Sequence, residues 1–392
     1  MVNNKNGALP ESSDTASLDL PDSLNPLQLE EFGRTVGILE NSKCMGHDDA
    51  NSLNEIGTYG AKGLSAYACH AMEMGYMDES NIMAPLHEIW AKLASHEPDV
   101  DGLLANALRV GQVNAATMAL LDRGHCDRFG APTPTQVRMT AVGNKANILV
   151  SGHDMVDLYS LLEQTQDTGV NVYTHGEMLP AHMYPKLKAF KHLVGNYGTA
   201  WQAQKFEFAT FPGPIVVTTN CIVEPRKKYR GRIYTTNEVS VDGVQHIVGR
   251  DFSKVIQQAQ QETLGFPLTV EPARFHTVGF NHRVVLPLAN QMIEAVQQGH
   301  LSRIFLIGGC DGSEWDRSYY TDLAEATPED SLILTLGCAK NRLIHSPKLA
   351  EAKLANGMPR LMDMGQCNDS YSAVVVAIKL AKAWDVLSMI FH

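Results

Sequence analysis

Six short runs rich in apolar and β-branched residues constrain the fold of this chain more than any other feature of its sequence. Each run passes directly into a polar or glycine-containing turn, which is typical of buried parallel strands. Segments with helical character separate the runs, and this alternation predicts doubly wound parallel sheets. The six runs read NKANILVSGHD, GVNVYTHGE, GPIVVTTNC, RIFLIGGCDG, SLILTLGCAK and PRLMDMGQC.

A different pattern precedes these runs. Ala, Leu and Met recur at helical spacing from about Ser52 to Gln136, which predicts a helical bundle. We therefore expect an α/β protein in which an N-terminal helical bundle is followed by two doubly wound parallel-sheet (Rossmann-like) domains, the last one incomplete. The expected division is a polar, disordered leader at 1–43, the bundle at 44–140, one α/β domain at 141–283 and a truncated α/β domain at 284–392.

Composition excludes several classes of function. The formal charge of −11 disfavours binding to a phosphate backbone, so we expect no nucleic-acid partner. No run of about 18 apolar residues occurs, so we expect no membrane insertion and a cytoplasmic location. The chain has 7 cysteines and no signal peptide, which indicates reduced thiols or metal ligands and not a disulfide framework.

Metal-capable side chains follow all six predicted strands. The carboxyl edge of a parallel sheet is where ligands bind, because the loops there converge on a crevice. Thiolates select iron–sulfur, zinc or copper(I), while His and carboxylate suit iron or zinc. The long separations between the last three cysteines differ from the close cysteine pairs of zinc fingers. The six residues are His153, Glu177, Cys221, Cys310, Cys338 and Cys367.

Each of these residues also has a structural interpretation. A cysteine at a strand end is often a small buried hydrophobic residue, and a lone histidine there can belong to a turn or the core. Glu177 could cap the following helix. Within the expected bundle, Cys69 and His70 are interpreted as core positions. Only the joint pattern of six residues favours a metal site.

Seven ordered motifs resemble the hybrid cluster protein (hydroxylamine reductase) family. The resemblance runs from about Cys44 to Lys382. The motifs are SGHD at 151–154, NVYTHGEMLPAH at 171–182, GNYGTAWQ at 195–202, FPGPIVVTTNC at 211–221, GGCDG at 308–312, LTLGCAKNR at 334–342 and GQCNDSYSA at 365–373.

The resemblance implies an oxidoreductase that reduces hydroxylamine to ammonia and water, and in some members nitric oxide, with electrons from a redox partner. It implies that the six strand-end residues are ligands of a hybrid iron–sulfur–oxygen cluster of the 4Fe-2O-2S type. Cys310 matches the cysteine that can carry a persulfide. His153 and Glu177 would be the other catalytic residues, and either could relay protons when freed from iron.

The sequence departs from the family pattern at both ends. Cys44 falls where the last cysteine of an amino-terminal motif belongs, but residues 1–43 contain no cysteine. One thiolate cannot hold a four-iron cluster, so we expect the family's second 4Fe-4S cluster to be absent and Cys44 to be idle. The family continues beyond this chain to a Glu and a Lys beside the hybrid cluster, so we expect a truncated chain with little or no hydroxylamine reductase activity.

Two alternatives remain at this point. Carbon monoxide dehydrogenases share the expected architecture but have a nickel-containing cluster. The chain could also be an inactive fragment or paralogue that lacks a complete cluster.

Overall fold

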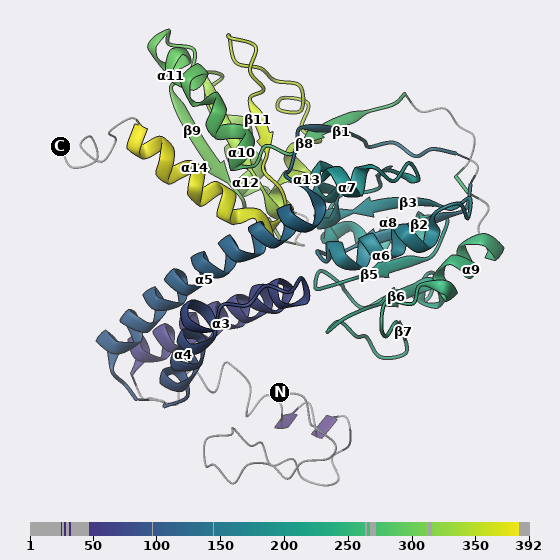
Figure 1. The fold of residues 1–392 in the computed structure, drawn as a ribbon, viewed down its shortest axis with the longest axis horizontal. Helices are drawn as coiled ribbons and strands as arrows, with labels where there is room; N and C mark the ends of the chain where they lie inside the picture. The colour runs from purple at the N-terminus through teal and green to yellow at the C-terminus, as the bar shows by residue number, and fades with distance from the viewer. Residues whose placement is uncertain are drawn as a thin grey trace.

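The structure, a computed structural model, describes most of the chain from His47 to Ala383 (Figure 1). Most of the expected leader, together with Cys44 and Cys310, lies outside the described residues. The expectations for these parts of the sequence therefore stay predictions. The described residues are 25, 27–28, 31–32, 47–95, 97–143, 145–262, 265–266, 272–309, 311–312 and 316–383.

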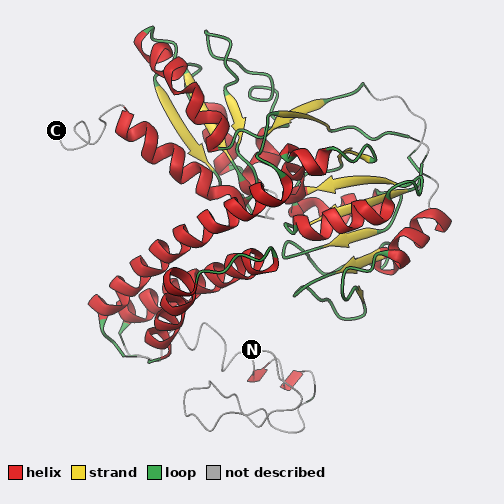
Figure 2. Cartoon of the chain, viewed as in Figure 1, coloured by secondary structure: helices red, strands yellow, loops and turns green. Residues whose placement is uncertain are grey.

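The bundle consists of three long helices and one π-helical turn at the lower left of Figures 1 and 2. Helix α5 begins after Asp99, whose carboxylate accepts a hydrogen bond from the amide of Gly102 at 3.0 Å. The bundle core includes Leu64, Ile89 and Val110, one residue from each helix. The elements are α3 (Asp48–Glu73), η1 (Glu79–Met83), α4 (Ala84–Ala94) and α5 (Val100–Phe129).

A six-stranded parallel sheet carries the first half of the strand-end residues. Its spatial order is β4-β3-β2-β5-β6-β7, which in chain order is the doubly wound dinucleotide-fold arrangement. Every residue of β2 and β3 is buried, which is why their sequences are continuous apolar runs. The strands are β2 (Asn147–Ser151), β3 (Asn171–His175), β4 (Leu193–Asn196), β5 (Ile215–Val217), β6 (Ile233–Thr235) and β7 (Gln245–His246).

Helices cover both faces of this sheet. Ile148 and Val150 of β2 share a core with Leu158 of α6, whereas Leu149 shares a core with Phe208 of α8. Alternate side chains of one strand therefore point into two different cores, as a strand covered on both faces requires. The helical elements after these strands are α6 (Met155–Thr165), η2 (Gly176–Met183), α7 (Pro185–Lys188), η3 (Trp201–Ala203), α8 (Gln204–Thr210), η4 (Arg230–Arg232) and α9 (Ser253–Glu262).

A second, five-stranded sheet has the order β1-β8-β11-β10-β9 and is parallel except for the pairing of β1 with β8. Leu332 of β10 packs with Met292 and Val376, while Ile333 belongs to the core on the other face. Its elements are β1 (Thr135–Arg138), β8 (Phe275–Val278), α10 (His282–Val285), η5 (Leu286–Leu288), α11 (Ala289–Gln297), β9 (Arg303–Ile307), α12 (Tyr319–Ala326), β10 (Ser331–Thr335), η6 (Gly337–Ala339), α13 (Lys340–Leu343), β11 (Leu361–Asp363), η7 (Cys367–Asp369) and α14 (Ser370–Ala383).

The fold class expected from the sequence is confirmed, since a helical region precedes two largely parallel sheets. Strand pairing crosses the expected domain bounds, however. β1 and β8 come from segments assigned to the bundle and to the first α/β domain, yet both belong to the second sheet. The local sequence of these two short strands does not predict their pairing, because the antiparallel pairing of β1 with β8 depends on tertiary contacts.

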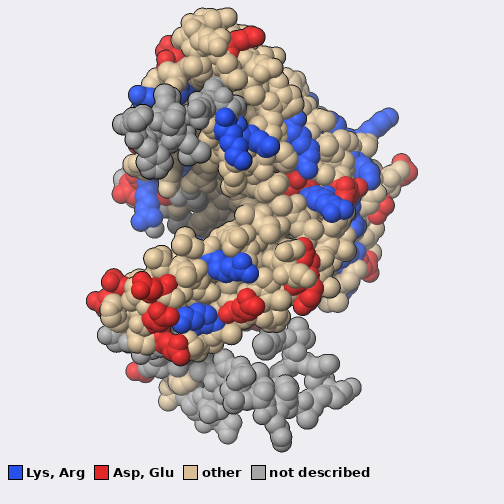
Figure 3. Space-filling view, turned by 60° about the vertical axis from the view of Figure 1, so that its left-hand side comes forward, with Lys and Arg blue, Asp and Glu red and all other residues tan. Residues whose placement is uncertain are grey.

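Charge is distributed unevenly over the surface. In the view of Figure 3, acidic side chains gather on the helical bundle, and basic side chains are more frequent on the α/β part above it. Within the described ranges, no helix is both long and apolar enough to cross a bilayer.

Candidate metal centre

Three of the predicted donors meet between the two sheets. His153 follows β2, Glu177 follows β3, and Cys367 follows β11 of the other sheet. One ligand atom from each lies within 4.8 Å of the other two. The His153 Nε2 atom is 3.2 Å from the Cys367 Sγ atom and 4.0 Å from the Glu177 Oε2 atom. The carboxyl edges of both sheets therefore contribute to one buried group of metal-capable side chains.

Unusual backbone conformations turn the chain at these strand ends. Gly152, directly before His153, has φ 107°, and a Cβ atom there would lie 2.5 Å from the Thr218 hydroxyl oxygen. Only glycine fits such a close approach at positive φ. Cys221 also has a positive φ, 70°, although it is not glycine. Strain of this kind persists only where the surrounding structure enforces it, and it is frequent at ligand sites.

A threonine from the neighbouring strand end orients His153. The Thr219 hydroxyl accepts a hydrogen bond from the His153 amide at 2.8 Å and lies 2.7 Å from its ring Nδ1 atom. If Nδ1 carries the proton, Nε2 offers its lone pair toward Cys367 and Glu177, which is the usual arrangement of a metal-binding histidine. Burial lowers the pKa of His153 to about 4, so the ring is neutral at pH 7.

A buried lysine neutralises Glu177. The Lys340 Nζ atom donates to Glu177 Oε1 at 2.5 Å and to the Gly337 carbonyl at 2.9 Å. Burial is the largest influence on the pKa of Glu177 and raises it, but the Lys340 ammonium, His153 and the Cys367 amide together outweigh burial and hold that pKa below its ordinary value. The other carboxylate oxygen accepts the amide of Cys367 at 2.9 Å. Glu177 is therefore held as an anion within reach of the His153 and Cys367 donors.

The remaining cysteines extend the group. A hydrogen bond between the thiols of Cys338 and Cys221 is the largest cause of the raised pKa of Cys338, followed by burial. Burial also raises the pKa of Cys367, and nearby Glu177 adds to the effect. The thiols of Cys338 and Cys367 stay protonated at pH 7 unless a metal binds, because metal coordination displaces the proton. The prediction for Cys310 falls outside the described residues.

Several residues around the group were missed by the sequence reasoning. Lys340 and Thr219 lie in the quoted motifs, but the sequence near a strand end does not show which residue a lysine or a threonine contacts. Burial, followed by nearby Cys367, raises the pKa of Tyr67 on α3, which places that ring beside the group.

The core interpretation of Cys69 is wrong, since that side chain is exposed. Its neighbour His70 instead approaches the side chain of Asn368, with its Nδ1 atom 3.4 Å from the amide nitrogen.

The donor set fits an iron–sulfur centre with a softer and a harder side. The thiols of Cys338, Cys221 and Cys367 could offer sulfur ligands, and His153 and Glu177 could offer nitrogen and oxygen ligands that also suit iron. Beside them, the buried Asn341 and Gln366 amides have polar atoms that make no hydrogen bond to any residue that the structure describes. Buried polar atoms usually have a partner, and such exceptions are typical of sites that hold a bound group.

Comparisons with known proteins identify the family of the chain. The Prismane/CO dehydrogenase family matches residues 16–389. The chain is 48% identical over 357 residues to a hydroxylamine reductase of Zymomonas mobilis, covering 91% of the chain and 64% of that protein. It is 47% identical to a hydroxylamine reductase of Moorella thermoacetica, covering 91% and 82%. A hydroxylamine reductase of Escherichia coli is 51% identical over 325 residues, covering 83% and 58%.

Solved structures share the fold at low identity. Carbon monoxide dehydrogenase IV of Carboxydothermus hydrogenoformans has a TM-score of 0.61 at 16% identity, covering 82% of this chain and 60% of that one. A carbon monoxide dehydrogenase of Thermococcus sp. AM4 has a TM-score of 0.60 at 15% identity, covering 89% and 71%. The chain spans about two thirds of the length of the Zymomonas relative, at 64%.

Proposed function

The chain belongs to the Prismane/CO dehydrogenase family, and from this premise we propose that it is an iron–sulfur oxidoreductase that reduces hydroxylamine. The reaction adds two electrons and two protons, breaks the N–O bond and releases ammonia and water. The electrons would come from a separate redox partner in the cytoplasm. Nitric oxide is a second proposed substrate. We propose no conventional 4Fe-4S cluster for this chain.

The observation that carries the proposal is the meeting of His153, Glu177 and Cys367 from two different sheets within 4.8 Å. Together with Cys221, Cys338 and Cys310 they would hold a hybrid iron–sulfur–oxygen cluster of the 4Fe-2O-2S type. Such a cluster would supply iron that binds the substrate and would deliver electrons to it. The relatives named hydroxylamine reductase support the nitrogen-oxide branch of the family.

The residues of this chain have separate tasks in the proposed reaction. Lys340 helps to keep Glu177 ionised in a buried site, so the carboxylate is available to bind iron. Thr219 fixes the ring of His153 so that Nε2 points into the group. The strand-end turns and helix α3 enclose these side chains and limit the access of water, which strengthens the electrostatic interactions within the site.

Metal content and product analysis test the proposal. The chain is expressed and purified without oxygen, and ammonia is measured with hydroxylamine and a chemical electron donor. We expect the purified chain to contain iron and sulfide and to form ammonia, even if slowly. The iron, the sulfide and the ammonia formation should all be lost in His153→Ala and retained in Cys126→Ser. Bound nickel with carbon monoxide oxidation would instead favour the carbon monoxide dehydrogenase alternative, and a colourless, iron-free chain would favour an inactive paralogue. Either result contradicts the proposal.

A further inference from the structure

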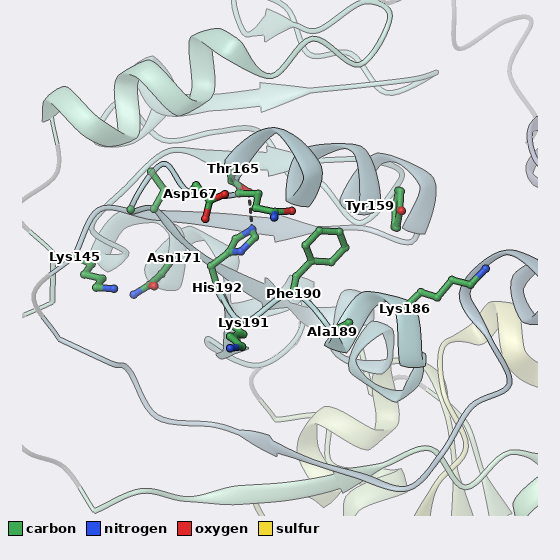
Figure 4. Close-up of a pocket in the computed structure, with 13 residues that line it drawn as sticks. Lys145, Tyr159, Thr165, Asp167, Asn171, Lys186, Ala189, Phe190, Lys191 and His192 are labelled. Carbon is green, nitrogen blue, oxygen red and sulfur yellow. Dashed lines mark hydrogen bonds between the residues drawn. The ribbon is translucent and has the colours of Figure 1, made fainter.

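A lysine-lined cavity opens at the opposite edge of the six-stranded sheet from the metal-capable group. Its volume is about 620 Å³, within the range of small-molecule sites. Lys145 precedes β2, Asn171 begins β3 and His192 precedes β4, so the cavity lies at the amino ends of these strands (Figure 4). Nothing in the proposed reaction uses these residues, and the inference below does not rest on the proposed function.

The charge of the cavity is unusual for this acidic chain. Lys145, Lys186 and Lys191 line it against a single carboxylate, Asp167. None of the three ammonium groups has an ion-pair partner within the part of the chain that the structure describes. In a chain of net charge −11, a concave site with excess positive charge favours an anionic ligand.

A side-chain amide adds hydrogen-bonding groups to the lining of the cavity. Asn171 is only 5% exposed and lines the cavity, yet within the described residues its side-chain amide makes no hydrogen bond. The polar atoms of this amide are accessible from the cavity, so they can bind a polar ligand or water there. Figure 4 shows the Lys145 and Asn171 side chains extending toward one another from adjacent strand starts, which places donors for an anion at one end of the cavity.

Aromatic rings form the other end of the cavity. Phe190 packs edge-on against Tyr159 at 5.6 Å and against His192 at 5.7 Å between ring centroids. The His192 Nε2 atom is held by Thr165 at 2.9 Å, so this wall is fixed. Burial lowers the pKa of His192, so the ring is neutral at pH 7 and the positive charge comes from the lysines alone. A planar ring can pack on such a wall.

Asp167 lies between these two ends in the view of Figure 4. A carboxylate there opposes a purely anionic ligand but can accept hydrogen bonds from sugar hydroxyls, a common role for acidic residues in nucleotide sites. From the order of anion donors, carboxylate and aromatic wall, we propose that the cavity binds a nucleoside monophosphate. Lys145, Lys191 and Asn171 hold the phosphate, Asp167 holds the ribose, and the base packs on Phe190. Lys186 extends away from this group and has no assigned role.

Calorimetry on the full chain tests the proposal. The probes are AMP, GMP, CMP and UMP, with adenosine (ring without charge) and ribose 5-phosphate (charge without ring) as comparisons. We expect at least one monophosphate to bind with a dissociation constant below about 1 mM, and both comparison compounds to bind at least about tenfold more weakly.

Matched variants assign the binding to this cavity. The double variant Lys145→Met/Lys191→Met should weaken nucleotide binding at least about tenfold, while Lys379→Met, an exposed lysine on α14, should leave it unchanged. Phe190→Leu should reduce the preference for the nucleotide over ribose 5-phosphate. No binding by any monophosphate up to about 10 mM, equal binding of adenosine, or no effect of the double variant would overturn the proposal.

Discussion

The two edges of the six-stranded sheet hold charged side chains in opposite ways. At the carboxyl edge, Glu177 is almost completely buried and pairs at 2.5 Å with Lys340, a buried residue that follows β10 of the other sheet. At the amino edge, Lys145 and Lys191 are exposed around an open cavity and make no ion pair among the described residues. A buried charge destabilises the fold unless it is paired with an opposite charge. An exposed charge without a partner has little effect on stability, so it can stay available for a ligand.

The difference indicates that the two ends of the same strands suit two kinds of site, a buried metal centre and an open cavity for an anionic ligand. Fixed, desolvated donors at one edge suit a permanently bound inorganic group, because they are held in place before it binds. Exposed lysines at the amino edge suit a ligand that binds reversibly. The contrast predicts that substitutions at the carboxyl edge destabilise the fold strongly, and that substitutions at the amino edge change binding with little effect on stability.

The largest effect is expected for Lys340→Met. Removing the ammonium leaves the Glu177 carboxylate buried without its cation, which should lower the free energy of unfolding by about 3–5 kcal/mol. Urea unfolding of the metal-free chain measures this loss. The double variant Lys340→Met/Glu177→Gln should recover much of the stability, because no unpaired charge remains. A loss below about 1 kcal/mol in the single variant would show that the buried pair is not what distinguishes this edge.

A smaller effect should come from His182, a buried histidine of η2, the helical segment that follows β3. Burial lowers the pKa of His182 to about 4, and its Nε2 atom lies 3.0 Å from the Thr174 hydroxyl. In the unfolded chain this histidine has its ordinary pKa, so between about pH 4 and 6.5 the unfolded chain binds more protons than the folded chain. The contribution of His182 to stability is therefore complete above this pH range and is lost as the pH falls through it.

Between pH 7 and pH 5 the loss attributable to His182 is about 2 kcal/mol. The variant His182→Gln lowers stability at both pH values by lost packing, but its unfolding free energy should fall less between pH 7 and pH 5 than that of the unmodified chain. Unfolding in urea at the two pH values gives the comparison. An unchanged pH dependence in the variant would mean that His182 is not held neutral.

Thr219→Val should produce an effect of about 1–2 kcal/mol. The hydroxyl that contacts both the amide and the ring of His153 is lost, while the shape of the side chain is kept. Iron affinity should also fall about 10–100-fold, because the ring is no longer oriented toward the other donors. The control Thr58→Val removes a hydroxyl that bonds only to its own helix at 2.8 Å and should leave iron content unchanged. Equal iron content in both variants would contradict the assigned role.

The smallest stability effect is expected at the amino edge. Lys191→Met should change the free energy of unfolding by less than about 0.5 kcal/mol, since the side chain is exposed and without an ion-pair partner among the described residues. Urea unfolding next to Lys340→Met provides the direct contrast. A destabilisation as large as that of Lys340→Met would remove the distinction between the two edges.

The sequence predicted six of the strands, because a buried strand leaves a local pattern of apolar residues. All six apolar runs contain a strand, and His153, Glu177 and Cys367 meet where strand ends converge. The pairing of β1 with β8 could not be predicted, because their pairing is set by tertiary contacts. The partnership of Lys340 with Glu177 was also hidden, since it joins residues 163 positions apart.

Iron and sulfide content tests the central claim most directly, because the claim is that both sheets contribute donors to one iron–sulfur centre. The chain and the variants His153→Ala, Cys367→Ser and Cys126→Ser are expressed and purified without oxygen, and circular dichroism verifies that each is folded. We predict about four irons per chain in the unmodified protein and in Cys126→Ser, with most of the iron and sulfide lost in the other two. Full iron content in both His153→Ala and Cys367→Ser would contradict the account.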